Sequence, residues 1–191
     1  MSLLVILSSP SGGGKSTVIK RLLKHNEIDF IYSVSFTTRK PRTGEVDGKD
    51  YFFISEQEFK KKIEQKEFLE WEQVHNYYYG TSRVLINQWM AQGKVVLLDI
   101  DVNGALSIRQ KFNNRTVSIF LEPPSKSELI KRLKNRKTES RQEIAKRLER
   151  LPIELEKKKY FDFVIQNNNL ENTVKETLNI IKTKINRGGN S

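Results

Sequence analysis

The residues best suited to chemistry form one short run, Ser8-Ser9-Pro10-Ser11-Gly12-Gly13-Gly14-Lys15-Ser16-Thr17. It matches the phosphate-binding motif G-x-x-x-x-G-K-[ST] from Gly14 onward, with Ser9 at the first glycine position. Glycines let backbone N–H groups face phosphate oxygens, and a following helix adds the positive end of its dipole. Lys15 would neutralise the β- and γ-phosphates, and the Ser16 hydroxyl would ligate Mg²⁺. We expect these residues to bind ATP: Ser11, Gly12, Gly13, Gly14, Lys15, Ser16 and Thr17.

Ser9 departs from the motif without excluding a phosphate-binding loop. A side chain forbids only some backbone conformations, so the loop survives if Ser9 keeps a negative φ. Pro10, which follows it, favours an extended conformation at Ser9.

A second group of chemically useful residues ends the apolar run Val95-Val96-Leu97-Leu98-Asp99-Ile100-Asp101. In a doubly wound sheet the carboxyl ends of the strands line the ligand crevice. An aspartate at such an end can hold Mg²⁺ through water in phosphate-loop enzymes. The sequence therefore predicts Ser16 and Asp99 as the magnesium ligands.

The composition excludes several other kinds of chemistry. The 191 residues include no cysteine, so disulfides, cysteine-ligated zinc and a thiolate nucleophile are all excluded. Only two histidines, His25 and His75, are present, which leaves little room for histidine metal sites or a Ser-His-Asp triad. Lys and Arg exceed Asp and Glu by 34 to 23, a net charge of +11, which indicates an anionic partner. No apolar run is long enough for a signal peptide or a membrane span.

The elements that must position these residues indicate an α/β fold. Continuous apolar runs at 3–7, 95–100 and 117–121, with a weaker one at 163–165, are typical of strands buried on both faces. Apolar residues at helical spacing follow Lys15 and recur from Val174 to Ile185. Strands and helices in alternation predict a parallel sheet flanked by helices, of the phosphate-loop NTPase type. Pro152 is expected to end or kink a helix near Leu151.

Two segments differ from this core. Residues 33–82 are rich in Tyr, Phe, Thr and Gly, with short alternating runs at 32–37 and 51–54, which predicts a small mixed or mostly antiparallel insertion. Residues 125–159 are helical in pattern and basic, with ten basic and four acidic side chains between 126 and 150. We therefore expect a core of residues 1–32, 83–124 and 160–191, a nucleotide-binding insertion over 33–82 and a helical lid over 125–159.

These motifs, in their order and spacing, resemble the guanylate kinase family from about residue 3 to residue 169. The most specific run is Ser35-Phe36-Thr37-Thr38-Arg39-Lys40-Pro41-Arg42-Thr43-Gly44-Glu45. Further matches are Gly48 to Phe53, Phe68-Leu69-Glu70-Trp71, Asn76 to Thr81, Asp99 to Val102 and Arg132 to Arg147. The resemblance implies an enzyme that makes GDP and ADP from GMP and ATP with Mg²⁺, and dGMP as a further acceptor.

The resemblance also implies how GMP is bound. The family holds the GMP phosphate with two arginines and two tyrosines, which match Arg39, Arg42, Tyr51 and Tyr79. Guanidinium forks and phenolic donors suit a dianionic phosphate. The family reads guanine with two carboxylates and two hydroxyls, which match these residues: Glu70, Asp101, Ser35 and Thr81. Carboxylates accept from N1 and N2 of guanine and a hydroxyl donates to O6, whereas adenine presents the opposite pattern at those edges.

Three lid arginines are implied to surround the phosphoryl group in flight: Arg132, Arg136 and Arg147. Phosphoryl transfer consists largely of positioning and charge neutralisation, so arginines on a mobile lid suit it, and no general base is needed. Asn167 matches the asparagine that contacts the adenine of ATP, although Asn168 and Asn169 follow where acidic residues are more usual. Asn103 stands where the family tends to have Gln.

Other function classes fit the sequence less well. Scaffold modules with the guanylate kinase fold typically lack an intact phosphate loop, whereas Gly12 to Thr17 is complete here. A regulatory GTPase would need an N-K-x-D sequence, which is absent. A nucleic-acid binder, suggested by the net charge, would need interleaved aromatic and basic residues, found only at 77–79. We expect a cytoplasmic enzyme, monomeric or a small homo-oligomer, that binds neither nucleic acid nor membrane.

Overall fold

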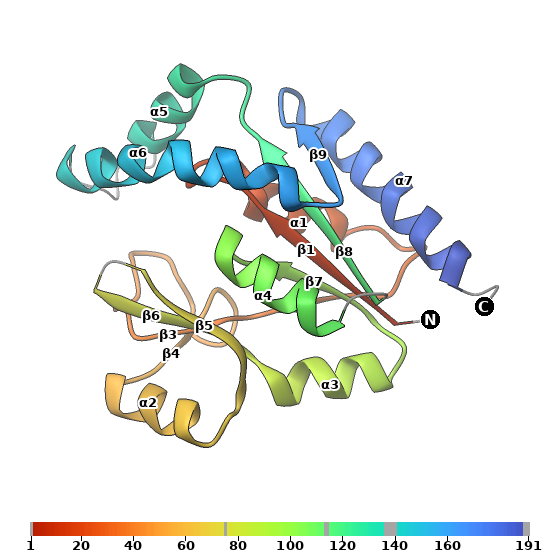
Figure 1. Ribbon diagram of the computed structural model, residues 1–191, viewed down its shortest axis with the longest axis horizontal. Helices are drawn as coiled ribbons and strands as arrows, with labels where there is room; N and C mark the ends of the chain where they lie inside the picture. Colours follow the sequence, from red (N-terminus) through yellow and green to blue (C-terminus); the bar gives the residue numbers. More distant parts are fainter. Residues whose placement is uncertain (1, 75, 113–114, 136–140, 189–191) are drawn as a thin grey trace.

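The protein is described by a computed structural model, which covers residues 2–74, 76–112, 115–135 and 141–188. Its larger sheet has five strands in the order β2-β7-β1-β8-β9, all parallel (Figure 1). The strands are β1 Leu3–Ser8, β2 Phe30–Ser33, β7 Val95–Asp99, β8 Thr116–Glu122 and β9 Phe163–Gln166. The predicted parallel α/β fold is confirmed.

Helices cover both faces of this sheet because both faces of its central strand are apolar. The odd residues of β1, such as Val5, pack with α1 (Lys15–Leu22) and α7 (Leu170–Gly188) in one buried cluster. The even residues, such as Leu4, pack with α3 (Arg83–Ala91) and α4 (Val102–Phe112) in a second cluster. A continuous apolar run rather than an alternating one follows from burial on two sides.

The second sheet is smaller and mixed, with strand order β4-β3-β6-β5. Its strands are β3 Phe36–Thr37, β4 Phe52–Phe53, β5 Phe68–Val74 and β6 Tyr77–Ser82. Strand β3 pairs parallel with β4, and β6 pairs antiparallel with both β3 and β5. Helix α2 (Glu56–Glu64) packs its buried Phe59 against Phe68 and Tyr78, with ring centroids 4.4 and 5.4 Å away.

The alternation at 32–37 predicts one strand of the insertion, but the structure divides this run between the two sheets. Tyr32 and Ser33 lie in β2 and pair with Leu97 and Leu98 of the larger sheet, whereas Phe36 and Thr37 lie in the smaller one. Strand β2 is an edge strand, with three of its four residues only half-buried. Because β2 is only half-buried, its sequence resembles that of the half-exposed strands of the insertion. The sequence pattern therefore did not separate the two sheets.

The basic segment forms helices α5 (Lys126–Asn135) and α6 (Arg141–Glu156), followed by the short 3₁₀ helix η2 (Lys157–Tyr160). Figure 1 shows α5 and α6 above the smaller sheet, and Leu155 of α6 packs on the same buried cluster as α3 and α4. Leu129, Leu133 and Leu151 form a small buried cluster between the two helices. This packing explains why α6 continues through Pro152 to Glu156 rather than ending near Leu151, since proline removes a single helical hydrogen bond.

No helix in the described ranges has both the length and the apolar character that crossing a bilayer requires.

Candidate active site

A cavity of about 420 Å³ opens where the carboxyl ends of β1 and β7 face the smaller sheet and α6. Thirteen of the residues predicted for the site line it: Ser11, Gly12, Gly13, Gly14, Lys15, Ser16, Arg39, Arg42, Tyr51, Glu70, Tyr79, Asp99 and Asp101. Five others predicted for the site do not line it: Thr17, Ser35, Thr81, Arg132 and Asn167. Arg136 lies outside the described residues, as does the side chain of Arg147 on α6.

The glycine-rich loop joins β1 to the N-terminus of α1. Gly14 is the N-cap of α1 with φ +99°, a left-handed conformation that favours glycine. The Lys15 ammonium donates to the Ser9 carbonyl at 2.9 Å and lies 3.8 Å from Asp99 Oδ1. The loop thus places a lysine at a helix N-terminus, which is the arrangement that phosphate binding needs, and the Asp99 carboxylate of β7 lies beside that lysine.

Among the described non-glycine residues Lys66 alone has a positive φ, so the φ of Ser9 is not positive, as the loop requires. Its hydroxyl is buried, donates to the Pro10 carbonyl at 3.0 Å and accepts from Lys15 at 3.4 Å. A Cβ at Gly13 would lie 2.4 Å from that hydroxyl, closer than real Cβ contacts come. The loop therefore accommodates Ser9 on condition that residue 13 is glycine.

The predicted magnesium ligands are adjacent. Ser16, in the first turn of α1, donates its hydroxyl to Asp99 Oδ2 at 3.0 Å. Asp99 ends β7, which the register places beside Leu7 of β1. A hydroxyl and a carboxylate are hard oxygen donors of the type that Mg²⁺ binds, usually together with water and substrate phosphates, so this donor set fits the ion.

Asn167 and Arg132 support the phosphate loop from behind. The buried Asn167 side chain donates to the Gly13 carbonyl at 2.7 Å and accepts from the Thr173 hydroxyl of α7 at 3.0 Å. Arg132 of α5 donates to Glu128 at 3.0 Å, and one of its nitrogens would lie 3.9 Å from a Cβ at Gly14. Both polar groups of Asn167 are thus engaged in holding the loop.

Arg39 is fixed by a carboxylate that the sequence analysis left without a role. Glu45 accepts two hydrogen bonds from the Arg39 guanidinium, at 2.8 and 2.9 Å, and one from the Arg42 backbone at 2.7 Å. The Arg39 guanidinium also lies 5.3 Å from the centroid of the Tyr51 ring, and the Tyr51 and Tyr79 rings are 6.0 Å apart. The signal for Glu45 was its place within the same specific run, six residues after Arg39.

Glu70 lies on β5 opposite Thr81 of β6 and accepts from its hydroxyl at 2.5 Å. Burial and the nearby Asp101 carboxylate raise the pKa of Glu70 to about 7, against the hydrogen bond from Thr81 that lowers it. Asp101 follows β7 and accepts from the Gly104 backbone at 2.8 Å, in the first turn of α4. Ser35 is buried between β2 and β3, and its carbonyl accepts from the Phe52 backbone.

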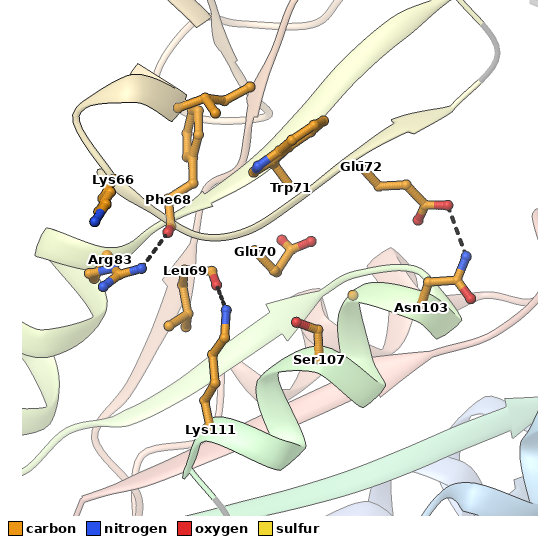
Figure 2. Close-up of a pocket in the computed structure, with 12 residues that line it drawn as sticks. Lys66, Phe68, Leu69, Glu70, Trp71, Glu72, Arg83, Asn103, Ser107 and Lys111 are labelled. Carbon is orange, nitrogen blue, oxygen red and sulfur yellow. Dashed lines mark hydrogen bonds between the residues drawn. The ribbon is translucent and has the colours of Figure 1, made fainter. Parts of the chain in front are cut away.

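Sequence reasoning also missed Glu72, which lines the same cavity. The available signal was strand alternation, since residues two apart on a strand share a face and Glu72 stands two after Glu70. Glu72 accepts from Asn103 at 2.9 Å, and Arg150 of α6 lies 3.6 Å from the same oxygen. Figure 2 shows Glu70 and Glu72 on β5 above α4, with the bond from Asn103 to Glu72.

Figure 2 draws a second cavity of about 520 Å³ between β5 and α4, which shares Glu70 and Glu72 with the first. Two basic side chains close on the free edge of β5 there. Lys111 donates to the Leu69 carbonyl at 2.6 Å, and Arg83 donates to the Phe68 carbonyl at 3.2 Å. These bonds occupy carbonyls that an edge strand would otherwise expose.

Comparison with known proteins agrees with this geometry. The sequence model of the guanylate kinase family matches residues 1–184. Guanylate kinase of Prochlorococcus marinus subsp. pastoris is 49% identical over 180 residues, covering 94% of this chain and 97% of the relative. Guanylate kinase of Thermotoga maritima is 44% identical over 181 residues, covering 95% and 86%. The crystal structure of guanylate kinase from Anaplasma phagocytophilum aligns with a TM-score of 0.78 at 31% identity, over 96% of this chain and 86% of that chain.

Proposed function

Because the chain belongs to the guanylate kinase family, we propose that it transfers the γ-phosphoryl group of ATP to GMP, giving ADP and GDP. The observation that carries this proposal is one cavity in which a phosphate-binding loop faces two carboxylates and two arginines. Lys15 stands on the loop side of that cavity, and Glu70 and Arg39 stand on the opposite side. A donor and an acceptor nucleotide can therefore meet between the two sheets.

In this proposal Glu70 and Asp101 accept hydrogen bonds from N1 and N2 of guanine. Glu70 is already oriented by the Thr81 hydroxyl, and Asp101 by the Gly104 backbone. Adenine offers an acceptor at N1 and no amino group at position 2, so AMP would leave buried carboxylates without donors. Such a mismatch discriminates by about 10⁴ where the site is built to bond a donor.

The GMP phosphate is assigned to Arg39, Arg42, Tyr51 and Tyr79. Arg39 presents a planar fork that Glu45 holds in one orientation, so little side-chain entropy is lost when phosphate binds. The neighbouring phenols add O–H donors at the same wall of the cavity. These contacts bring the acceptor oxygens toward the phosphate loop.

ATP is assigned to the phosphate loop, with Ser11, Gly12, Gly13, Gly14, Ser16 and Thr17 around its phosphates. Lys15 would exchange its bond to the Ser9 carbonyl for the β- and γ-phosphates. Ser16 and Asp99 would hold Mg²⁺, which would neutralise negative charge on the β- and γ-phosphates when bound. Asn167 is proposed to contact adenine on the strength of the family motif, and to do so it would have to give up its bond to Gly13 or to Thr173.

Transfer itself is assigned to positioning and charge. The attacking group is a phosphate oxygen that is already anionic, so no side chain has to remove a proton. Arg132 lies near Gly14 of the loop and donates to Glu128, and we propose that it turns to neutralise the transferring group. Arg136 and Arg147 are proposed for the same role on the strength of the family motif. We further propose that dGMP is an acceptor, that the enzyme is cytoplasmic, where its nucleotide substrates are made, and that it acts as a monomer or small homo-oligomer.

ADP release in a coupled assay, with GMP, dGMP, AMP, UMP and dTMP as rival acceptors, tests this function. We expect turnover with GMP and dGMP and a preference for GMP over AMP of about 10⁴. Lys15→Ala should lose most turnover and still bind GMP, because Lys15 belongs to the donor side. Equal rates with all five acceptors, or full activity of Lys15→Ala, would refute the assignment.

A further inference from the structure

Two carboxylate oxygens stand out at the edge of the proposed guanine site. Oε2 of Glu72 and Oδ2 of Asp101 are buried, and neither receives a hydrogen bond from a donor in the described part of the chain. A buried acceptor without a donor costs about 1–3 kcal/mol, so such atoms usually have a purpose. In each of the two residues the other carboxylate oxygen does have a partner, which shows that the groups are oriented and not merely left over.

The partners fix both groups from separate elements. Asp101 Oδ1 accepts from the Gly104 backbone in α4 at 2.8 Å. Glu72 Oε1 accepts from Asn103 at 2.9 Å and lies 3.6 Å from Arg150 of α6. Asn103 in turn accepts from Lys157 of η2 at 2.5 Å. Glu72 therefore joins β5, the start of α4 and the lid helix α6.

The two remaining oxygens satisfy each other if one proton lies between the carboxyl groups. Asp101 lies within hydrogen-bonding reach of Glu72. Burial, this bond and the Asp101 charge raise the pKa of Glu72 to about 7, against the effects of Asn103 and Arg150 that lower it. A proton is therefore available to Glu72 near neutral pH, and a protonated carboxyl can donate.

We propose that Glu72 is a positioning residue for Asp101: it donates a hydrogen bond to Oδ2 of Asp101 and holds that carboxylate toward the guanine amino group. The inference rests on the proposed function, because it is guanine recognition that Asp101 serves. A carboxylate oxygen has two lone pairs, so Oδ2 can accept from Glu72 and from the base together. Glu72 itself touches neither the phosphates nor the transferring group in this role.

No group of three or more His, Cys, Asp or Glu side chains in the described ranges is arranged to hold a metal ion. The charged or titratable groups near Glu72 include Glu70 on its own strand, Tyr79 opposite it on β6, and Arg150 of α6. Of these, Arg150 favours the ionised form of Glu72, so the protonated form that donates to Asp101 competes with the ion pair between Glu72 and Arg150.

Two substitutions at position 72 test the inference. Glu72→Ala removes the donor and should raise the KM for GMP about tenfold, the effect of one unsatisfied buried acceptor, with kcat changed less than about twofold. It should also narrow the preference for GMP over IMP, which is GMP without the exocyclic amino group. Glu72→Gln supplies a permanent N–H donor of the same shape and should keep the KM and the preference within about threefold of the parent enzyme.

The matched control is Glu67→Gln, at a carboxylate that pairs with Lys62 before the start of β5 and does not line the cavity. This control should have the same KM for GMP and the same kcat as the parent enzyme. A purely structural role for Glu72 would lower the thermal midpoint and the active fraction, hence kcat, and leave the GMP-to-IMP ratio unchanged. Three outcomes would overturn the inference. Both position-72 variants could have the KM for GMP and the GMP-to-IMP preference of the control, or kcat could fall in Glu72→Ala while its KM for GMP stays unchanged. The third is that Glu72→Gln shows the same changes as Glu72→Ala. Absence of GMP-dependent turnover in the parent enzyme would instead refute the proposed function.

Discussion

The pKa of Glu70 leads to a prediction about GMP binding. Burial and the Asp101 carboxylate raise this pKa to about 7, so the group titrates within the working range of the enzyme. Guanine offers N–H donors at N1 and N2, and a protonated Glu70 has lost acceptor capacity toward them. Binding GMP must then release the proton, and the KM for GMP should rise as the pH falls through 7.

The magnitude follows from the ionised fraction of Glu70. About half of the enzyme carries ionised Glu70 at pH 7, about one-tenth at pH 6 and nearly all at pH 8. If only the ionised form binds, the KM for GMP should rise about tenfold between pH 8 and pH 6. The GMP phosphate contributes its own dependence, because its second pKa is about 6.

Glu72 also titrates near pH 7 and opposes the effect of Glu70, because it loses its donor proton as the pH rises. Glu70→Gln isolates the contribution of Glu70 from those of Glu72 and the phosphate, since an amide does not titrate. Initial rates of ADP release at several GMP concentrations from pH 6 to 8.5 would give the KM profile of each variant. We expect the parent profile to be steeper than the variant profile below pH 7. Identical slopes in the two profiles would mean that Glu70 does not titrate against GMP, and the reasoning would be wrong.

Thermal unfolding provides a second readout of the same pKa. A carboxyl whose pKa is raised in the folded protein binds its proton more tightly there than in the unfolded chain, where the ordinary value is 4.5. Stability from this group is therefore present below pH 4.5 and is lost as the pH rises to about 7. Glu70→Gln should unfold at a higher temperature than the parent at pH 8, and the difference should shrink at pH 5.

Three further predictions concern contacts around the phosphates. Gly13→Ala should destabilise the protein by about 1–3 kcal/mol by overpacking, as measured by chemical denaturation. Adding Ser9→Gly should recover part of this stability, and a double variant no more stable than Gly13→Ala alone would contradict the Ser9 contact. Arg39→Lys should raise the KM for GMP about tenfold or more, because lysine cannot make the paired bonds to Glu45 or a bidentate contact to phosphate; an unchanged KM in steady-state assays would remove Arg39 from the site. Arg132→Met should lower kcat about 100-fold with little change in the Kd for either nucleotide, and single-turnover rates equal to those of the parent would refute its proposed role.

The sequence was sufficient to predict the larger sheet because burial on two faces leaves continuous apolar runs. The strands around Val5, Leu97 and Ile119 are of this kind, and all three lie in the parallel sheet. Edge strand β2 has no such run, so local pattern did not assign its last residue, Ser33, to that sheet. Pro152 shows the complementary limit: proline predicts an end or a kink near Leu151, and α6, packed against α5, does not end there.

The site shows a similar division. The residues proposed to face the substrates stand in short motifs, and motif and resemblance together indicated Lys15, Glu70 and Asp101, which line one cavity. Glu45 and Glu72 were not indicated, because each acts on another side chain rather than on a nucleotide. The partners of Glu45 lie in its own loop, whereas those of Glu72 meet it only when the fold brings β5, α4 and α6 together.

These partner carboxylates explain how a chain of net charge +11 keeps its binding groups oriented. Several cavity and lid cations lie close to a carboxylate: Lys15 to Asp99 at 3.8 Å, Arg39 to Glu45 at 2.8 Å, Arg132 to Glu128 at 3.0 Å and Arg150 to Glu72 at 3.6 Å. Each pair limits the rotamers of its cation, which lowers the entropy lost when phosphate binds. Arg39 has five N–H donors, of which two bond Glu45 and one the Lys40 carbonyl, so two remain for a phosphate. The same logic separates two kinds of variant: loss of a cation removes a substrate contact, whereas loss of its carboxylate keeps the contact and loosens it.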